Sequence, residues 1–313
     1  MTSRLAQIGL LCLLPILGAA QQAGPLPPIL KKHLDSLNQA RYEGQRVSES
    51  RIDGKWIRNQ ERVLADRSNL RIEFSPDSAN AGQIILFTGG KRYHIFLKER
   101  QANLTSAHKD EFLGRAMRFL HGGAKNSLAQ MNGGQVAGRA TELVSVQNPE
   151  GKPMLKLWID SATGVLLKRE AFDPRGERLA AMEFQRINFS PRFTKRDFEI
   201  DTRNLEVITP LDRVKRLSEA EGLPAFILKA PGLELEAARS LEVAGKKALL
   251  QMYSGKETRV SLFVMKGEPQ MPGRGKRGNM RRYSWKVGTI TLTLVGNQSE
   301  SELRTLAGMV GSP

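Results

Sequence analysis

Gln135-Val-Ala-Gly-Arg-Ala-Thr-Glu-Leu-Val-Ser-Val146 opens the stretch of sequence that decides the fold, and this stretch runs to Ile187. The quoted residues alternate roughly by twos and end at Gln147-Asn-Pro-Glu-Gly151. Further β-rich runs follow at residues 155–159, 165–169 and 179–187, with turns at 160–164 and 173–176. Short runs bounded by Gly, Pro, Asn and Asp are typical of strands joined in hairpins. We therefore expect an antiparallel meander that curls around or packs on other elements, which is more typical of a binding scaffold than of an enzyme.

The residues before the meander predict more strands and two helices. An amphipathic helix is indicated at residues 29–41, where Ile29, Leu30, His33, Leu34 and Leu37 share one face. Strands are expected at residues 47–52, 56–64, 70–74, 84–87 and 93–97, and a second helix at 110–120. The turns Asp53-Gly54 and Gly89-Gly90 separate two pairs of these strands.

A second unit is indicated after residue 206. Thr209 is a capping residue, Pro210 stands in the first turn and Gly222 follows the last, so both ends of a helix are defined. Strands at 226–228, 241–244, 248–253, 259–265 and 289–295 and a helix at 299–309 complete this unit. We expect domains at 25–203 and 206–313, meeting in the polar segment 201–210.

The first residues resemble a secretory signal. Arg4 precedes an apolar run at residues 8–17, and small residues precede Gln21. About 20 apolar residues are needed to span a bilayer, so this run is too short. The residues around Cys12, the single cysteine, do not fit a lipoprotein signal. We expect residues 1–20 to be removed, leaving an exported, soluble, periplasmic protein without cysteine, peripheral to the membrane at most.

The chain has a formal net charge of +16, and residues 269–299 contain no Asp or Glu. We expect the cations of this stretch to form an exposed, mobile docking loop for an anionic partner: Arg274, Lys276, Arg277, Arg281 and Arg282. In an exported protein such a partner is a lipid head group, an acidic polymer or an acidic protein segment, and nucleic acid is not expected. The alternative is a solvated basic surface without a partner.

The sequence gives no catalytic or metal-binding constellation. Gly273-Arg-Gly-Lys-Arg-Gly278 matches a dinucleotide-binding pattern in letters, but that pattern requires a strand before it and a helix after it. The four histidines lack zinc-ligand spacing, and there is no Gly-x-Ser-x-Gly motif. We expect a protein that is not an enzyme and has no cofactor or metal; an exported enzyme acting on acidic polymers is a more distant alternative.

An ordered set of motifs resembles one known family. Tyr42-Glu-Gly44, Val136-Ala-Gly-Arg139, Leu157-Trp-Ile-Asp160 and Thr163-Gly-Val-Leu-Leu-Lys168 resemble the N-terminal domain of the MucB/RseB regulators. The second unit is similar to their C-terminal domain in Tyr253-Ser-Gly-Lys-Glu-Thr-Arg-Val-Ser-Leu-Phe-Val264 and in Leu294-Val-Gly296. The likeness extends over nearly the whole mature chain, although each motif by itself consists mostly of turn and core residues.

The resemblance implies an α+β, β-rich fold: a half-open antiparallel β-barrel wrapped on helices, as in LolA and LolB, with a smaller α+β C-terminal domain. It also implies an envelope-stress sensor that holds acyl chains in an apolar concavity and restrains a membrane anti-sigma factor through its periplasmic segment. The alternative is a LolA-like carrier of lipid or lipoprotein. Candidate walls of the concavity, which could equally be ordinary core, are Leu143, Trp158, Leu166 and Phe184.

Overall fold

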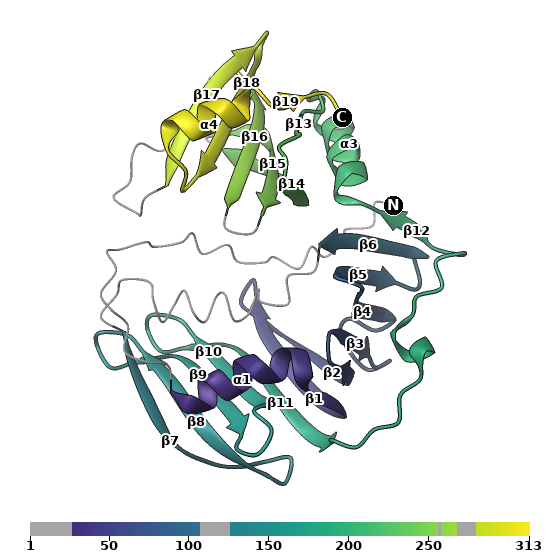
Figure 1. Cartoon of the computed structure of the whole chain (residues 1–313), viewed down its shortest axis with the longest axis vertical. Helices are drawn as coiled ribbons and strands as arrows, with labels where there is room; N and C mark the ends of the chain where they lie inside the picture. The colour runs from purple at the N-terminus through teal and green to yellow at the C-terminus, as the bar shows by residue number, and fades with distance from the viewer. Residues whose placement is uncertain (1–26, 107–125, 244, 256–257, 268–279) are drawn as a thin grey trace. The chain divides into compact units, whose positions relative to one another are not determined.

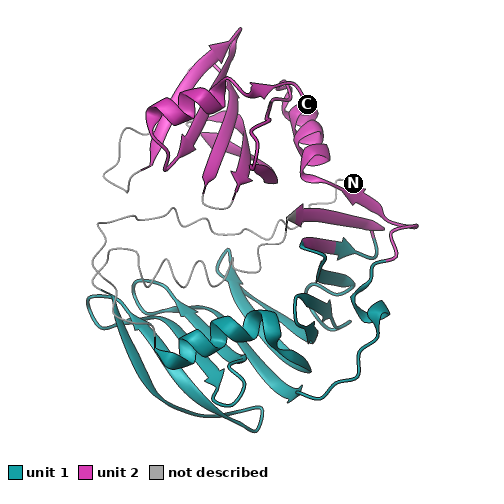
Figure 2. Cartoon of the chain, in the orientation of Figure 1, with its two compact units in different colours: residues 1–90, 95–98, 108–200 teal, residues 91–94, 99–107, 201–313 magenta. Residues whose placement is uncertain are grey.

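The structure is a computed structural model, and it describes residues 27–106, 126–243, 245–255, 258–267 and 280–313. The chain divides into two compact units (Figure 2). Unit 1 comprises residues 1–90, 95–98 and 108–200, and unit 2 comprises 91–94, 99–107 and 201–313, in each case as far as they are described. The domain limits expected from the sequence stay a prediction. The grouping of residues 99–106 with unit 2 is a feature that the sequence did not indicate.

As far as the chain is described, the large sheet has twelve strands and an unpaired edge on each side, and Figure 1 labels its strands. They are β1 (Arg41–Ile52), β2 (Lys55–Asp66), β3 (Asn69–Phe74), β4 (Gln83–Thr88), β5 (Lys91–Phe96), β6 (Gln101–Ser106), β7 (Ser127–Val136), β8 (Arg139–Gln147), β9 (Pro153–Asp160), β10 (Leu166–Phe172), β11 (Arg178–Asn188) and β12 (Glu206–Ile208). Their order is β12-β6-β5-β4-β3-β2-β1-β11-β10-β9-β8-β7, and the β12–β6 pair is parallel. The predicted meander is therefore the half of this sheet from β7 to β11.

The sheet curls strongly without closing. In the strand order β7 stands four places from β11, a separation of about 19 Å in a flat sheet. Nevertheless, Cα atoms of the two strands lie within 8 Å of each other. Because β7 and β12 both remain edges, the curled sheet is half-open. The fold class expected from the sequence is confirmed.

Helix α1 (Pro28–Gln39) defines one face of this sheet. Its Ile29 and Leu30 are buried together with Val144 and Leu157 of β8 and β9. Paired residues of neighbouring strands share a face. A row of such pairs continues the helix-covered face across the sheet: Leu157–Arg169, Arg169–Met182, Met182–Ser48 and Ser48–Asn59. We call this face, from β8 through β4, the α1 face.

Unit 2 has its own core. A five-stranded sheet runs in the order β14-β15-β16-β18-β17, with β14 (Glu234–Val243), β15 (Lys246–Ser254), β16 (Arg259–Lys266), β17 (Arg281–Val287) and β18 (Ile290–Gly296). Helices α3 (Pro210–Glu221) and α4 (Glu300–Ala307) contribute Val214 and Leu303 to its core. The remaining short elements are the 3₁₀ helix η1 (Lys195–Phe198) and the pair β13 (Ile227–Leu228) and β19 (Val310–Gly311). This is the smaller α+β domain that the sequence predicted.

Several sequence-based expectations need correction. The run from Gln135 to Val146 is not one strand, because Ala137 and Gly138 form a tight turn with positive φ angles of 51° and 73° between β7 and β8. Strands β6 and β17 were not expected. The predicted helix at 110–120 and the signal at 1–20 lie outside the described residues. Among those described, no helix is long and apolar enough to cross a membrane.

Candidate ligand-binding face

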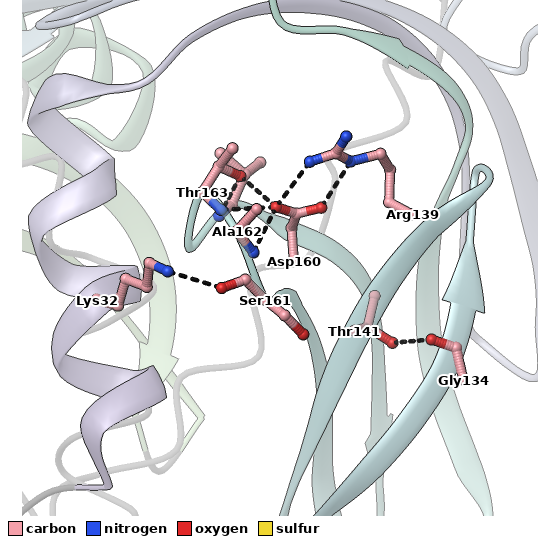
Figure 3. Close-up of polar contacts among 9 residues, drawn as sticks. Lys32, Gly134, Arg139, Thr141, Asp160, Ser161, Ala162 and Thr163 are labelled. Carbon is pink, nitrogen blue, oxygen red and sulfur yellow. Dashed lines mark hydrogen bonds and ion pairs between the residues drawn. The ribbon is translucent and has the colours of Figure 1, made fainter.

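Three of the motifs that carry the family resemblance, through Arg139, Asp160 and Thr163, meet in one polar cluster at the start of the β9–β10 turn (Figure 3). The Asp160 carboxylate is 1% exposed and accepts hydrogen bonds from Arg139 Nε at 2.8 Å and Nη2 at 3.3 Å. It also accepts from the Thr163 backbone N at 2.7 Å, the Thr163 hydroxyl at 2.8 Å and the Ala162 backbone N at 3.1 Å. Burial disfavours the charged form, but the bonds from Arg139 and Thr163 outweigh it and lower the pKa of Asp160.

The same turn receives helix α1. Lys32 Nζ donates to the Ser161 carbonyl oxygen at 2.7 Å, and the Gly164 carbonyl oxygen accepts from His33 Nδ1 at 2.9 Å and Ser36 Oγ at 3.0 Å. Gly164 has a φ of +77°, and a Cβ there would lie 2.6 Å from the Lys32 carbonyl oxygen. Only glycine fits this contact. These motifs therefore fix the helix to the sheet and are architectural.

The Tyr-x-Gly motif has a packing reason too. A Cβ on Gly44 would lie 2.8 Å from Phe184 Cε1, so the missing side chain leaves room for the Phe184 ring. Tyr42 meets that ring edge-on at 5.9 Å between centroids. Burial raises the pKa of Tyr42, and the nearby positive charge of Arg46 offsets part of the shift.

An arginine–glutamate pair lies on the α1 face beside these rings. Arg46 Nε donates to Glu61 Oε2 at 2.6 Å, and the Ser48 hydroxyl donates to the other carboxylate oxygen of Glu61. The side chains of Arg46 and Glu61 are 19% and 5% exposed, and the guanidinium stands 5.8 Å from the Phe184 ring centroid. Within the described part of the chain, Glu61 is the only side chain that the Arg46 guanidinium bonds to. Its two terminal nitrogens can therefore serve a ligand.

Apolar side chains surround this pair. Strand pairing places Phe74 opposite Glu61 and Phe184 opposite Arg46, so one row of the sheet is aromatic at both ends and charged in the middle. The adjoining positions on the same face carry Leu70, Ile72 and Ile85; Leu70 and Ile85, like Phe74, are only partly buried. Charged groups held in an apolar surface can bind a molecule that has an anionic head and an apolar tail.

The four candidate wall residues have different surroundings. Phe184 is buried in a core cluster with Val63 and Met182, and Trp158 and Leu166 pack against the same cluster while partly exposed. Leu143 lies opposite Trp158 in the β8–β9 pair, on the face away from α1, and is outside that core. Their role as cavity walls stays a prediction.

The candidate basic loop is divided. Arg281 and Arg282 begin strand β17 and pair with Gly296 and Val295 of β18, so they belong to a strand and not to a loop. Arg274, Lys276 and Arg277 lie outside the described residues. Docking of an anionic partner by these residues stays a prediction.

Sequence reasoning missed Arg46 and Glu61, although a signal was present. The turn at Asp53-Gly54 fixes a hairpin in which Ile52 faces Lys55, and counting outward from it places Arg46 opposite Glu61. Opposite charges at facing positions of a hairpin indicate a cross-strand pair. The sequence did not show that this pair would lie on the face that α1 and Phe184 make apolar.

Comparison with known proteins finds similar structures but no matching family model or curated sequence. A crystal structure of MucB in complex with MucA(peri) is 16% identical with a TM-score of 0.44, covering 91% of this chain and 97% of that one. The Pseudomonas aeruginosa MucA/MucB complex is 14% identical at the same coverage and TM-score. A LolA superfamily protein from Nitrosomonas europaea is 11% identical with a TM-score of 0.28, covering 55% of this chain and 96% of that one. MucB and LolA-superfamily proteins, which the sequence motifs resemble, are thus also among the solved structures to which this chain is similar.

Proposed function

We propose that this chain is an exported, periplasmic binding protein of the MucB/RseB type that holds an anionic lipid on the α1 face and restrains an anti-sigma factor. The observation that carries the lipid half is the Arg46–Glu61 pair set among partly buried apolar side chains. A buried ion pair is weak evidence for stability, because desolvation offsets most of the attraction. Its position in an apolar surface therefore favours a binding role.

The chemistry of the site defines the ligand class. A guanidinium binds carboxylate or phosphate through paired N–H groups, and low local polarity strengthens such contacts. Glu61 holds Arg46 by Nε, and among the described residues neither terminal nitrogen of Arg46 donates a hydrogen bond. Acyl chains contribute about 0.8 kcal/mol for each methylene placed against apolar side chains such as Phe74 and Ile85. A fatty acid or a phosphorylated acyl lipid satisfies both requirements.

The regulatory half of the proposal rests on the ordered motifs and on unit 2. Unit 2 has a complete core of its own, with α3 and α4 packed on a five-stranded sheet. A LolA-like carrier, the second candidate, is supported by the curled sheet of unit 1 but leaves unit 2 without a role. Among the described residues, no group of three or more His, Cys, Asp or Glu is placed to hold a metal ion, and the proposal requires no catalysis.

Displacement of a fluorescent fatty acid from the mature protein tests the lipid half, with native mass spectrometry of the purified protein to identify bound lipid. The double variant Arg46→Met/Glu61→Leu keeps the volume of the pair and removes its charge. We expect its affinity for fatty acids to fall about tenfold or more, since a charge-assisted contact contributes about 1.5–3 kcal/mol. Arg62→Met is the matched control, because Arg62 is the next residue on β2, points to the other face and is 52% exposed.

Two outcomes would overturn the lipid half. One is unchanged fatty-acid affinity in the double variant; the other is an equal loss in Arg62→Met. The regulatory half is tested separately, by measuring whether the mature protein protects the periplasmic segment of a neighbouring-gene anti-sigma factor from proteolysis. Without protection, the carrier becomes the better reading of unit 1.

A further inference from the structure

Strand β17 forms an edge of the five-stranded sheet in unit 2. It pairs with β18 on one side, and in the described part of the chain no strand pairs with its other side. An edge strand presents backbone N–H and C=O groups outward at alternate residues, which is a template for one more strand. The backbone of β17 is thus chemically ready for strand addition.

The side chains of β17 alternate between two kinds of surface. Tyr283 and Trp285 point toward the core of unit 2, where their rings stack at 5.8 Å and Arg304 of α4 lies 5.4 Å from the Tyr283 ring centroid. Arg282 and Lys286 lie on the opposite face and are exposed. The strand contains no acidic residue.

We propose that β17 takes up an extended acidic peptide segment of a partner protein as an added strand. In such a ladder the incoming side chains also alternate. Those on one face meet Arg282 and Lys286, and those on the other meet Tyr283 and Trp285. The segment recognised is therefore one in which Asp or Glu alternates with apolar residues. This inference rests on the proposed partner-binding role and is independent of lipid binding.

Charge selects this occupant over a second copy of the chain. Two β17 strands side by side would bring like charges together, which disfavours self-pairing. The other edges of the two larger sheets, as far as they are described, differ: β7 has no charged residue, β12 has three residues and one charge, the acidic Glu206, and β14 carries Glu234, Glu236, Arg239 and Glu242. Among these four described edges, only β17 combines a uniform positive charge with exposed alternate positions.

The test uses the full mature chain and a capped, fluorescein-labelled peptide of about four Glu-Val repeats, long enough to span the strand. We expect saturable binding by fluorescence anisotropy and slower amide hydrogen exchange within residues 281–287. A peptide of the same composition with its glutamates and valines in separate blocks is the control for charge alone. In an extended peptide the backbone N–H groups of the valines point to one edge and those of the glutamates to the other. Two further peptides, one N-methylated at all valines and one at all glutamates, each lack the donors of one edge. The peptide that lacks the donors facing β17 is expected to lose binding.

Variants of the protein separate the β17 contact from general attraction. Arg282→Glu/Lys286→Glu is expected to weaken binding about tenfold, because two favourable cross-strand pairs become unfavourable. Lys215→Glu/Lys229→Glu makes the same change of net charge at exposed positions of unit 2 outside the sheet and is expected to leave binding unchanged. Thermal unfolding of each variant shows whether unit 2 remains folded.

Three results would overturn the inference: equal binding of the block peptide, indifference to both N-methylated peptides, or slower exchange elsewhere than in β17. Binding to anionic vesicles that depends on Arg282 and Lys286 while the peptide does not bind would assign the strand to a lipid surface instead. Peptide binding without protection of the anti-sigma segment would keep the docking strand and remove the proposed regulatory partner.

Discussion

Two buried carboxylates in the large sheet, Asp160 and Glu61, both pair with an arginine, and the rest of their surroundings differ. Asp160 also accepts bonds from two backbone amides and a hydroxyl of its own turn, so the fold around it satisfies the carboxylate completely. Glu61 has Arg46 and Ser48, side chains from a neighbouring strand, among partly buried apolar groups. The difference separates a carboxylate that builds the fold from one whose arginine partner we propose to bind a ligand.

The largest effect is expected from Asp160→Ala. Removal leaves the amides of Ala162 and Thr163 without their acceptor, and we expect the free energy of unfolding to fall by about 4 kcal/mol. Urea denaturation measures it. Asp173→Ala is the matched control, because Asp173 caps the next hairpin turn through the amides of Arg175 and Glu177 but is less buried, and about 1 kcal/mol is expected there. Equal losses of stability at the two sites would show that the burial of Asp160 adds nothing to its contribution.

A smaller effect is expected where α1 meets the Asp160 turn. Gly164→Ala places a methyl group against the Lys32 carbonyl oxygen and should lower stability by about 2–3 kcal/mol. Gly54→Ala has the same φ of +77° with nothing within 4 Å of the added Cβ, so it isolates the backbone cost of about 1 kcal/mol. If the two variants unfold at the same urea concentration, α1 is not held at Gly164.

Replacing both members of each arginine–carboxylate pair by apolar residues tests whether the two pairs differ in their contribution to stability. Arg46→Met/Glu61→Leu is expected to change the free energy of unfolding by less than about 1 kcal/mol, because apolar groups of similar volume replace a pair whose desolvation offsets its attraction. Arg139→Met/Asp160→Leu should cost about 3 kcal/mol, since the turn amides lose their acceptor. The measurement is again urea denaturation; strong destabilisation by the first double variant would make the Arg46–Glu61 pair structural.

The smallest effect concerns His33 at the α1 contact. Burial lowers the pKa of His33, with the bond to Gly164 offsetting part of the shift. Because the unfolded chain keeps a histidine pKa near 6.5, it binds a proton that the folded chain resists. The stability contribution is therefore full above about pH 6.5 and is lost as the pH falls from there toward the lowered folded pKa.

His33→Asn tests this dependence, since asparagine keeps an N–H donor for the Gly164 carbonyl and does not titrate. We expect the variant to lose less stability than the original protein between about pH 7 and pH 5. Burial and Arg92 also lower the pKa of His94, to about 4, but this group is common to both proteins and cancels in the difference. Parallel pH profiles would show that His33 is not responsible.

The elements that the sequence predicted well carry their own boundary signals. Helix α3 begins after Thr209, whose hydroxyl and the Asp212 carboxylate form a reciprocal capping box, and ends at Gly222 with a φ of +61°. The β7–β8 turn was missed because Ala137 adopts a positive φ without the Asn-Gly or Asp-Gly pair that marks such turns. Strand β17 was missed because its arginines and lysine read as a solvated loop, although β18 pairs with it along its length.

What the sequence determined by itself is local: alternating strands, turns at Asp53-Gly54 and Asp173 to Gly176, and helix ends. These features depend on residues a few positions apart, whose chemistry is the same in any fold. The tertiary structure decided the contacts between distant residues, such as His33 with Gly164, 131 positions apart, and Phe184 over Gly44. Helix packing and strand register bring those partners together, and the same register places Arg46 and Glu61 among apolar side chains, where a paired charge becomes a candidate binding site.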